Sequence, residues 1–307
     1  MMKTYHLCLS AGEEVLFRDL ADYNRGFNIF ALSLYRTDSV GLVEAFMATH
    51  CHLMIQSAKP DEFMFRFRNS YSKYFNKKYH RSGKLGEGCH FTLEVVGFHH
   101  RVAAASYILR NPLHHGVVPI PYAYPHSSVN SIFRQEMGKF TEDRIIDRRY
   151  HSRFIGRDKE YPDSYKMNED GLFIRESVLD VPQVESLYVS PRMFNYYMSR
   201  KSGEEWEHEQ KKDNNGAEPI SLRHIEMSVG IHTLDQMLTF ESGRSDYRRM
   251  TDIQLCGIID RLVSVRYGKG SVYELSPSEK NHFANHLHEK YHCAESQLRR
   301  CLAMHLY

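Results

Sequence analysis

The stretch His50-Cys51-His52-Leu53-Met54-Ile55-Gln56-Ser57 decides the fold prediction, because its apolar run suits a buried β-strand. Side chains alternate across a strand, so His50 and His52 project from one face of the sheet and Cys51 from the other. Two imidazoles on one face can chelate a divalent ion. The chain has 19 histidines, however, and such a pair also arises by chance, so alone it is equally compatible with a structural role.

The segments on either side of this strand predict an α+β fold in which strands and helices alternate. Residues 3–10 and 39–48 suit strands, and a helix is expected within 16–36. After the His-x-His strand, a helix is predicted over 61–79, since an aromatic residue recurs there at every fourth position. A strand or hairpin over 90–98 and an alanine-rich helix over 99–111 follow, and Pro112 is expected to help stop that helix.

The alanine-rich helix contains the second candidate feature, Tyr107-Ile108-Leu109-Arg110-Asn111. Positions i and i+4 of a helix share a face, so Tyr107 and Asn111 lie one above the other. His100 and Ala104 continue the same stripe, and the three alanines at 103–105 allow close approach to a sheet or a DNA backbone. Taken alone, the pentapeptide is better explained as part of an ordinary helix.

Positive charge is concentrated on the predicted helix 61–79 and the turn after it. The formal net charge of the chain is only +2, whereas residues 59–84 hold 8 Lys and Arg against 2 Asp and Glu. A local basic patch indicates a polyanionic partner. Most of the aromatic residues of this helix are expected to be core. The DNA-binding candidates are therefore its charged residues: Arg66, Arg68, Lys73, Lys77, Lys78, Arg81 and Lys84.

Composition places the chain among ordinary globular proteins, with 42% hydrophobic and 25% charged residues. No apolar run is long enough to cross a membrane and no signal-peptide core is visible, so we expect a cytoplasmic protein without a membrane partner. The 6 cysteines are scattered without a C-x-x-C pair, which predicts reduced thiols rather than disulfides or a cysteine-rich zinc site.

We divide the chain into a catalytic domain over 1–130, an extension of unknown role over 131–250 and a helical region over 251–307. A solvated linker is expected at 200–219. Ser276-Pro277-Ser278-Glu279 predicts a capping-box start for a helix over 277–290. A turn at 291–293 and a second helix over 294–304 would complete a helix-turn-helix-like element. Its DNA-binding candidates are Gln297, Arg299 and Arg300. The alternative is a helical hairpin that only packs on the catalytic domain.

In this order, the motifs resemble those of the single-tyrosine transposases, in particular the REP-associated tyrosine transposases. Residues 46–55 look like the strand that carries the His-hydrophobic-His motif of that family, and residues 106–112 look like its nucleophile helix. Tyr71 to Asn76, with Gly83 and Gly88, is similar to its basic helix and turn, and 124–128 to the motif that ends its domain. Thr49 and Cys51 depart from the family pattern, which usually has Asn and a bulkier apolar residue there.

The resemblance implies an HUH nuclease core, a ferredoxin/RRM-like antiparallel sheet with helices on one face, followed by a mainly helical C-terminal extension. It also implies Tyr107 as nucleophile, with His50, His52 and Asn111 holding Mg²⁺ or Mn²⁺. The implied reaction cleaves and rejoins single-stranded or hairpin DNA through a 5′-phosphotyrosine intermediate. No ATP is required, and the sequence has no Walker-type loop. Such an enzyme would be a monomer or a homodimer.

Three other interpretations fit part of the pattern. A replication initiator or relaxase of the HUH class shares the His pair, but the spacing from Tyr107 to Asn111 favours the transposases. A domesticated hairpin-DNA-binding protein would bind the same DNA without strand transfer, although all four candidate residues are present. A zinc hydrolase is disfavoured, because no Asp-His follows the His-x-His motif.

Overall fold

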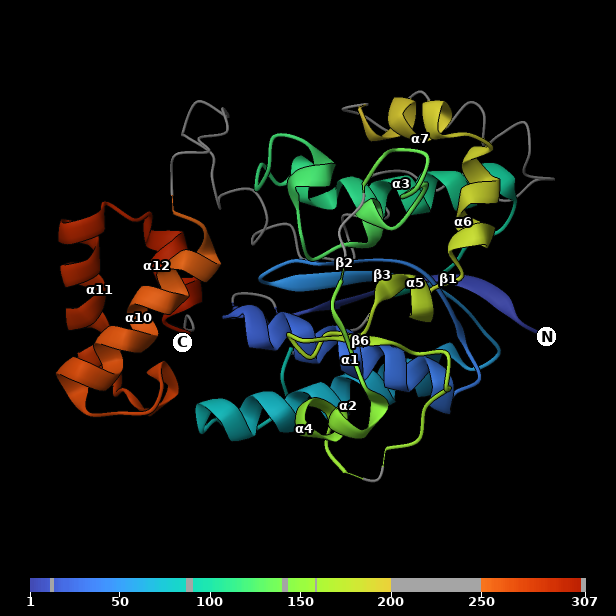
Figure 1. Cartoon of the computed structure of the whole chain (residues 1–307). Helices are drawn as coiled ribbons and strands as arrows, with labels where there is room; N and C mark the ends of the chain where they lie inside the picture. The colour runs from blue at the N-terminus through green and yellow to red at the C-terminus, as the bar shows by residue number, and fades with distance from the viewer. Residues whose placement is uncertain (12–13, 87–90, 140–142, 158, 200–249, 305–307) are drawn as a thin grey trace.

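The computed structural model describes residues 1–11, 14–86, 91–139, 143–157, 159–199 and 250–304. Its centre is a four-stranded antiparallel sheet with the strand order β2-β3-β1-β4 (Figure 1). The fold class is therefore α+β, as predicted. The elements of this half, in chain order, are β1 (Lys3–Ser10), α1 (Leu20–Arg36), β2 (Val40–Phe46), β3 (His50–Ser57), α2 (Pro60–Tyr79), β4 (Phe91–Glu94) and α3 (Phe98–His114).

Helices cover both faces of the sheet, which corrects the expectation of helices on one face. Leu53 and Ile55 of β3 pack with α1 and α2, while Met54 packs with α3. Figure 1 shows α1 and α2 below the sheet and α3 above it. The central strands must therefore be apolar, or internally hydrogen-bonded, on both faces.

Local sequence explains the bounds of the two helices that flank β3 in the chain. Asp19 caps α1, because its carboxylate accepts from the backbone N–H of Asp22. In α2, Pro60 stands at the first turn and His80 closes the helix in the left-handed conformation. The aromatic stripe predicted for α2 is confirmed. The five residues that recur at every fourth position are all buried: Phe63, Phe67, Tyr71, Phe75 and Tyr79.

Helix α3 differs from the prediction at its C-terminal end. It continues through Pro112 to His114, so Pro112 lies inside the helix rather than ending it. Proline has no N–H, and the carbonyl of Ile108 therefore lacks its usual helical partner. The Pro112 carbonyl instead accepts from the N–H of Val117, 2.9 Å away, in the loop that follows.

The segment from 143 to 199 wraps around the edge of β2 and contributes to both layers. Phe173 packs on the α1 and α2 side, and Tyr188 and Phe194 pack on the α3 side. Leu179 forms a bridge with Gly41, so the segment crosses beside the outer strand β2.

The predicted linker at 200–219 lies outside the described residues, and so does Gly88. The segment from 143 to 199 contains β5 (Ile145–Ile146), α4 (Ser152–Ile155), β6 (Met167–Asn168), α5 (Arg175–Val178), α6 (Val181–Tyr188) and α7 (Pro191–Met198).

The C-terminal region forms a helical unit with its own core at one end of the sheet (Figure 1). Buried Arg18 fastens it to the first half, since it contacts the Asp260 carboxylate at 2.7 Å and donates to the Cys301 carbonyl at 2.8 Å. The predicted capping box of Ser276 and Glu279 is confirmed. The unit consists of α10 (Asp252–Tyr267), α11 (Pro277–Tyr291) and α12 (Glu295–Cys301).

Two of the three DNA-binding candidates on α12 are internal, which corrects the prediction. Gln297 and Arg300 are about 5% and 4% exposed, and both bind the fully buried Asp252 of α10. Their side chains are therefore not available to bases or phosphates. Arg299 points outward and pairs with Glu295 on its own helix at 2.7 Å. Gln297 and Arg300 thus fix α12 on α10, while a DNA-reading role of this region and a role in packing alone both stay predictions.

Short 3-10 turns connect several of these elements, and five cysteines of the described chain are buried free thiols. No helix among the described residues has both the length and the apolar character needed to cross a bilayer. The 3-10 turns are η1 (Pro121–Ala123), η2 (Ser128–Asn130), η3 (Arg148–Tyr150) and η5 (Val272–Glu274).

The neighbouring arginines of α12 give a matched test of these roles. We expect Arg300→Gln to destabilise the chain by on the order of 3 kcal/mol, because Asp252 would keep a buried charge without its cation. Arg299→Gln removes only an exposed pair and should change stability by about 0.5 kcal/mol or less. Urea unfolding followed by circular dichroism measures both. Equal small effects would contradict the buried pair.

Candidate active site

The two histidines of β3 lie on the sheet face that α3 covers. His52 pairs with Cys8 of β1 and Ala45 of β2, so it sits in a row across three strands. His50 and His52 are 0% exposed, and their ring centroids are 5.1 Å apart. The alternation expected for this strand is confirmed.

Helix α3 brings Asn111 directly onto the first of these histidines. Asn111 Oδ1 lies 2.9 Å from His50 Nε2, and the Thr49 hydroxyl lies 3.0 Å from His50 Nδ1. An amide oxygen only accepts, so this network assigns the proton to His50 Nε2 and makes Nδ1 the acceptor from Thr49. The amide nitrogen of Asn111 donates to His115 Nε2 at 3.2 Å. His115 thus joins the site, which sequence analysis had not foreseen.

The second histidine is held by a residue of the first strand that sequence analysis did not single out. His6 Nε2 lies 2.9 Å from His52 Nδ1. The other ring nitrogen of His52, Nε2, is buried and has no hydrogen-bond partner. Tyr107 packs edge-on against this ring, with 5.4 Å between the centroids. The structure therefore brings together all four residues predicted for the site, while their chemical roles remain predictions.

Burial sets the charge state of the imidazoles. It lowers the pKa of His50 to about 4 and that of His6 to about 3. Burial also lowers the pKa of His52 and of His115 well below its usual value. All four rings are therefore neutral at neutral pH. A neutral imidazole, with a lone pair on one nitrogen, is the form that coordinates a metal ion.

The donor atoms fit a divalent ion in one specific respect. His52 Nε2 is a buried acceptor or donor without a partner, a state that costs free energy unless a ligand occupies it. His50 Nε2 and Asn111 Oδ1 face one another in the same site. Within the described ranges, no three His, Cys, Asp or Glu side chains are arranged to hold a metal. A site with three protein ligands around His50 and His52 would therefore include the amide oxygen of Asn111.

The site is closed to solvent in this conformation. Tyr107 is about 4% exposed and Asn111 is fully buried. The end of α3 borders the site, since the ring centroid of His114 lies 6.1 Å from that of Tyr107 and that of His115 lies 5.4 Å from that of His50. The hydroxyl oxygen of Tyr107 is itself buried.

The predicted basic helix lies on the other face of the sheet from Tyr107 (Figure 1). Of its candidates and those of the following turn, Arg66, Lys73, Lys77 and Lys84 are exposed. This arrangement separates the exposed charges from the candidate nucleophile by the thickness of the sheet.

The other three basic candidates are held by internal partners. Arg68 donates to the Leu85 carbonyl at 3.1 Å, and Arg81 pairs with Glu14 at 3.2 Å. Lys78 contacts Asp22, which is fully buried, at 2.7 Å. These contacts give Arg68, Lys78 and Arg81 structural roles, which corrects the expectation that all seven are available to DNA.

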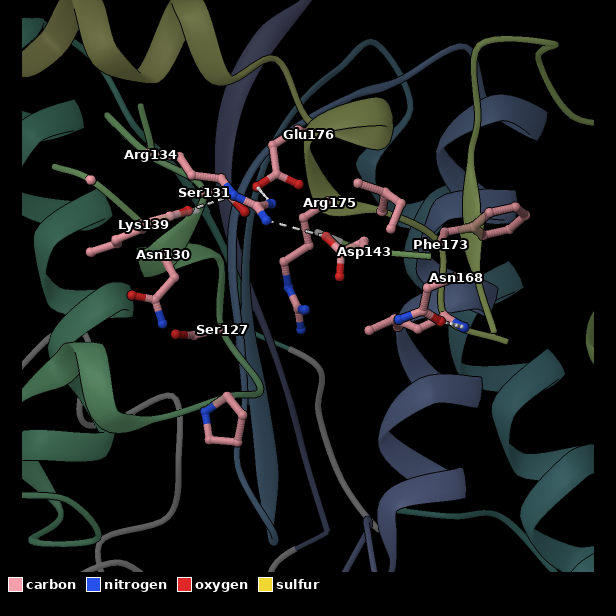
Figure 2. A pocket seen from close by; sticks show the side chains of 14 residues that line it. Ser127, Asn130, Ser131, Arg134, Lys139, Asp143, Asn168, Phe173, Arg175 and Glu176 are labelled. Atoms are coloured by element: carbon pink, nitrogen blue, oxygen red, sulfur yellow. Dashed lines mark hydrogen bonds and ion pairs between the residues drawn. The ribbon is translucent and has the colours of Figure 1, made fainter. Parts of the chain in front are cut away.

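A cavity of about 460 Å³ lies beside the edge of β2, away from Tyr107. Its lining comes from residues 125–139, Asp143 and residues 168–176, and Figure 2 shows Arg134 reaching Glu176 and Asp143 across it. Those ion pairs measure 2.8 and 3.3 Å. Arg175, which also lines the cavity, pairs with Glu44 at 2.6 Å. Lys139 instead lies over the Tyr122 ring, 3.7 Å from its centroid, and its ammonium nitrogen has no hydrogen-bond partner among the described residues.

Comparisons with known proteins found little. No protein-family model matches the chain, and no curated protein matches it. Among solved structures, the chain is similar to a REP-associated tyrosine transposase bound to a REP hairpin. The two share 11% sequence identity with a TM-score of 0.37, and the match covers 46% of this chain and 86% of that one.

Two adjacent lysines of α2, Lys77 and Lys78, test whether an internally paired lysine stabilises the fold while an exposed one does not. Lys78→Gln should destabilise the chain by about 2 kcal/mol, because Asp22 loses its cation but keeps other hydrogen bonds. Lys77→Gln should change stability by about 0.5 kcal/mol or less. Thermal unfolding measures both. If Lys78→Gln left stability intact and instead altered the salt dependence of DNA binding, Lys78 would be a DNA contact.

Proposed function

We propose that this chain is a metal-dependent DNA strand-transfer enzyme of the single-tyrosine HUH class, as its resemblance to the REP-associated tyrosine transposases implies. The observation that carries the proposal is the contact of Asn111 Oδ1 with His50 Nε2 at 2.9 Å. It brings one face of α3 onto the His-x-His strand, and Tyr107 is one turn away on that face. The substrate class is single-stranded or hairpin DNA, and the protein would be cytoplasmic.

The order of elements supports the same proposal. The chain runs β-α-β-β-α-β before α3, and the sheet has the order β2-β3-β1-β4 with antiparallel neighbours. We assign this arrangement to the ferredoxin/RRM-like core of the HUH nucleases. Helix α3 then serves as the nucleophile helix on the face of β3 that carries the histidines.

His50, His52 and Asn111 would hold Mg²⁺ or Mn²⁺. Two imidazoles among three protein ligands favour Mn²⁺, since Mg²⁺ prefers oxygen donors. When bound, the ion polarises the scissile phosphate and stabilises negative charge on its oxygens. The partnerless Nε2 of His52 is the ligand atom that supports this assignment. His6 orients it, because a histidine that donates from Nδ1 presents a lone pair at Nε2.

Tyr107 supplies the nucleophile. Its hydroxyl oxygen bonds to phosphorus while the bond to the 3′ oxygen breaks, and the phenolic proton ends on the departing 3′-hydroxyl. The product is a 5′-phosphotyrosine link. Because the phosphodiester energy is kept in that link, another 3′-hydroxyl can reverse the step and join DNA strands without ATP.

One observation favours a second candidate function, hairpin-DNA binding without strand transfer. Tyr107 is about 4% exposed and both β3 histidines are 0% exposed. A domesticated protein could keep this buried cluster for stability alone. The two functions differ in whether a covalent protein–DNA adduct forms.

Replacement of Tyr107 by Phe tests the proposal directly. The change removes one oxygen, so it should abolish the covalent adduct with 5′-labelled hairpin DNA in Mn²⁺ while leaving binding affinity nearly unchanged. Denaturing gel electrophoresis detects the adduct. Tyr188→Phe is a matched control, because it removes a buried hydroxyl that contacts Ser106 of the same helix. If the Tyr107→Phe variant still formed the adduct, the nucleophile would be another tyrosine. If the wild type formed no adduct, the second candidate function, hairpin-DNA binding without strand transfer, would be favoured.

The metal ligands can be tested without relying on activity. His52→Ala should eliminate Mn²⁺ binding measured by electron paramagnetic resonance, and EDTA should stop adduct formation. His6→Phe keeps a ring of similar size but removes the partner of His52, so Mn²⁺ affinity should fall by roughly 10- to 100-fold. Asn111→Ala should be milder than His52→Ala. Undiminished cleavage in EDTA would exclude the metal from the reaction.

A further inference from the structure

A strongly basic groove lies on the outer side of the α1 and α2 layer. It has a volume of about 320 Å³ and runs between α1, α2, Ile155 and Lys159. None of the described residues that line it is acidic or aromatic. Five of them are basic: Arg25, Arg36, Arg66, Lys73 and Lys159.

Helical spacing builds this groove from both helices. Arg25, Ser33 and Arg36 recur on one stripe of α1, which borders the groove. Arg66 and Lys73 are seven residues apart on α2, two turns along the same face. Two parallel stripes of cations therefore face one another across a shared depression. Counting charges along the sequence identified only the stripe on α2.

Three of the five cations have no acidic partner in the part of the chain that the structure describes. Arg36, Lys73 and Lys159 are exposed, and none forms an ion pair with another described residue. Arg66 pairs with Glu62 at 2.9 Å, and Arg25 donates to the Phe154 carbonyl. Unbalanced charges of one sign around a groove raise the local potential and attract an anionic ligand.

We propose that this groove binds backbone phosphates of the DNA on which the enzyme acts. The proposal rests on the proposed function and extends it. The floor consists of Ile29, Leu32, Ser33 and Ile155, each less than a tenth exposed, and the Ser33 hydroxyl donates to the Ile29 carbonyl at 2.7 Å. A floor of this kind offers no ring for base stacking and no donor pattern for base edges, whereas the rim offers charge for phosphates.

The position of the groove defines its part in the reaction. It lies on the α1 and α2 side of the sheet, and Tyr107 lies on the α3 side (Figure 1). The phosphate that reacts at Tyr107 and the phosphates that bind in the groove must therefore belong to different segments of the DNA. The groove adds affinity and orientation independent of sequence, and it does not contact the scissile bond.

The test is the salt dependence of affinity for a labelled hairpin with a single-stranded tail. The triple variant Arg36→Gln, Lys73→Gln, Lys159→Gln should lower the slope of log affinity against log salt by roughly 2 to 3, since each lost phosphate contact lowers it by about 0.7 to 0.9. The matched control is Arg261→Gln, Arg266→Gln, Lys290→Gln, which changes the net charge equally at exposed sites of α10 and α11. It should shift the slope by less than about half a unit.

Equal slopes in wild type and groove variant would overturn the proposal, as would an equal change in the control. Competition by inorganic phosphate or by deoxyadenosine monophosphate separates DNA from small anions. If either binds the wild type and not the groove variant while the DNA slope is unchanged, the groove is a small-anion site and the proposal is wrong. A failure of the proposed strand-transfer function is distinguished from a failure of the groove proposal, because in that case the wild type forms no Tyr107 adduct.

Discussion

Strand β3 is buried on both faces, and the side chains that tolerate this burial differ between them. Cys51, Leu53 and Ile55 bury apolar surface against α1 and α2, which is favourable without further partners. On the other face, His50 and His52 bury polar rings, which is costly unless each nitrogen finds a partner. Asn111 of α3 and Thr49 supply the partners of His50, and His6 of β1 supplies one partner of His52, whose Nε2 has none. The position of α3 on the sheet is therefore tied to the chemistry of His50.

Small residues make this placement of α3 possible. Ala104 and Ala105 are fully buried in the cluster that α3 shares with β2, so the helix backbone lies close to the sheet. Asn111, with its short side chain, reaches His50 from that distance. A larger residue at 104 or 105 would push α3 outward and lengthen the 2.9 Å contact. The same cluster takes in Tyr188 and Phe194, and residues 143–199 therefore help to fix α3 in place.

Local sequence patterns predicted the elements well, because a helix that buries one face has an apolar residue at every third or fourth position. They predicted the aromatic stripe of α2 and the capped start of α11. They did not predict partners that are distant in the chain. His6 meets His52 only through the register of β1 against β3, and Arg300 meets Asp252 across 48 residues. Neither pair has a local signal. For the same reason, charge counting could not separate exposed Lys77 from internally paired Lys78.

The hydrogen bond between His50 and Asn111 has a consequence for how the site would work. It occupies the two atoms that the proposed ion needs, so binding must replace this bond and return the His50 proton to Nδ1, facing Thr49. A net hydrogen bond contributes about 1 kcal/mol, which an ion bound by three ligands readily exceeds. The last turn of α3 contains Asn111 and His114, and Pro112 has removed one of its helical hydrogen bonds. Because Asn111 belongs to that turn, a movement that displaced the whole turn would also withdraw a proposed ligand. Tyr107 must therefore be uncovered while Asn111 keeps its place beside His50.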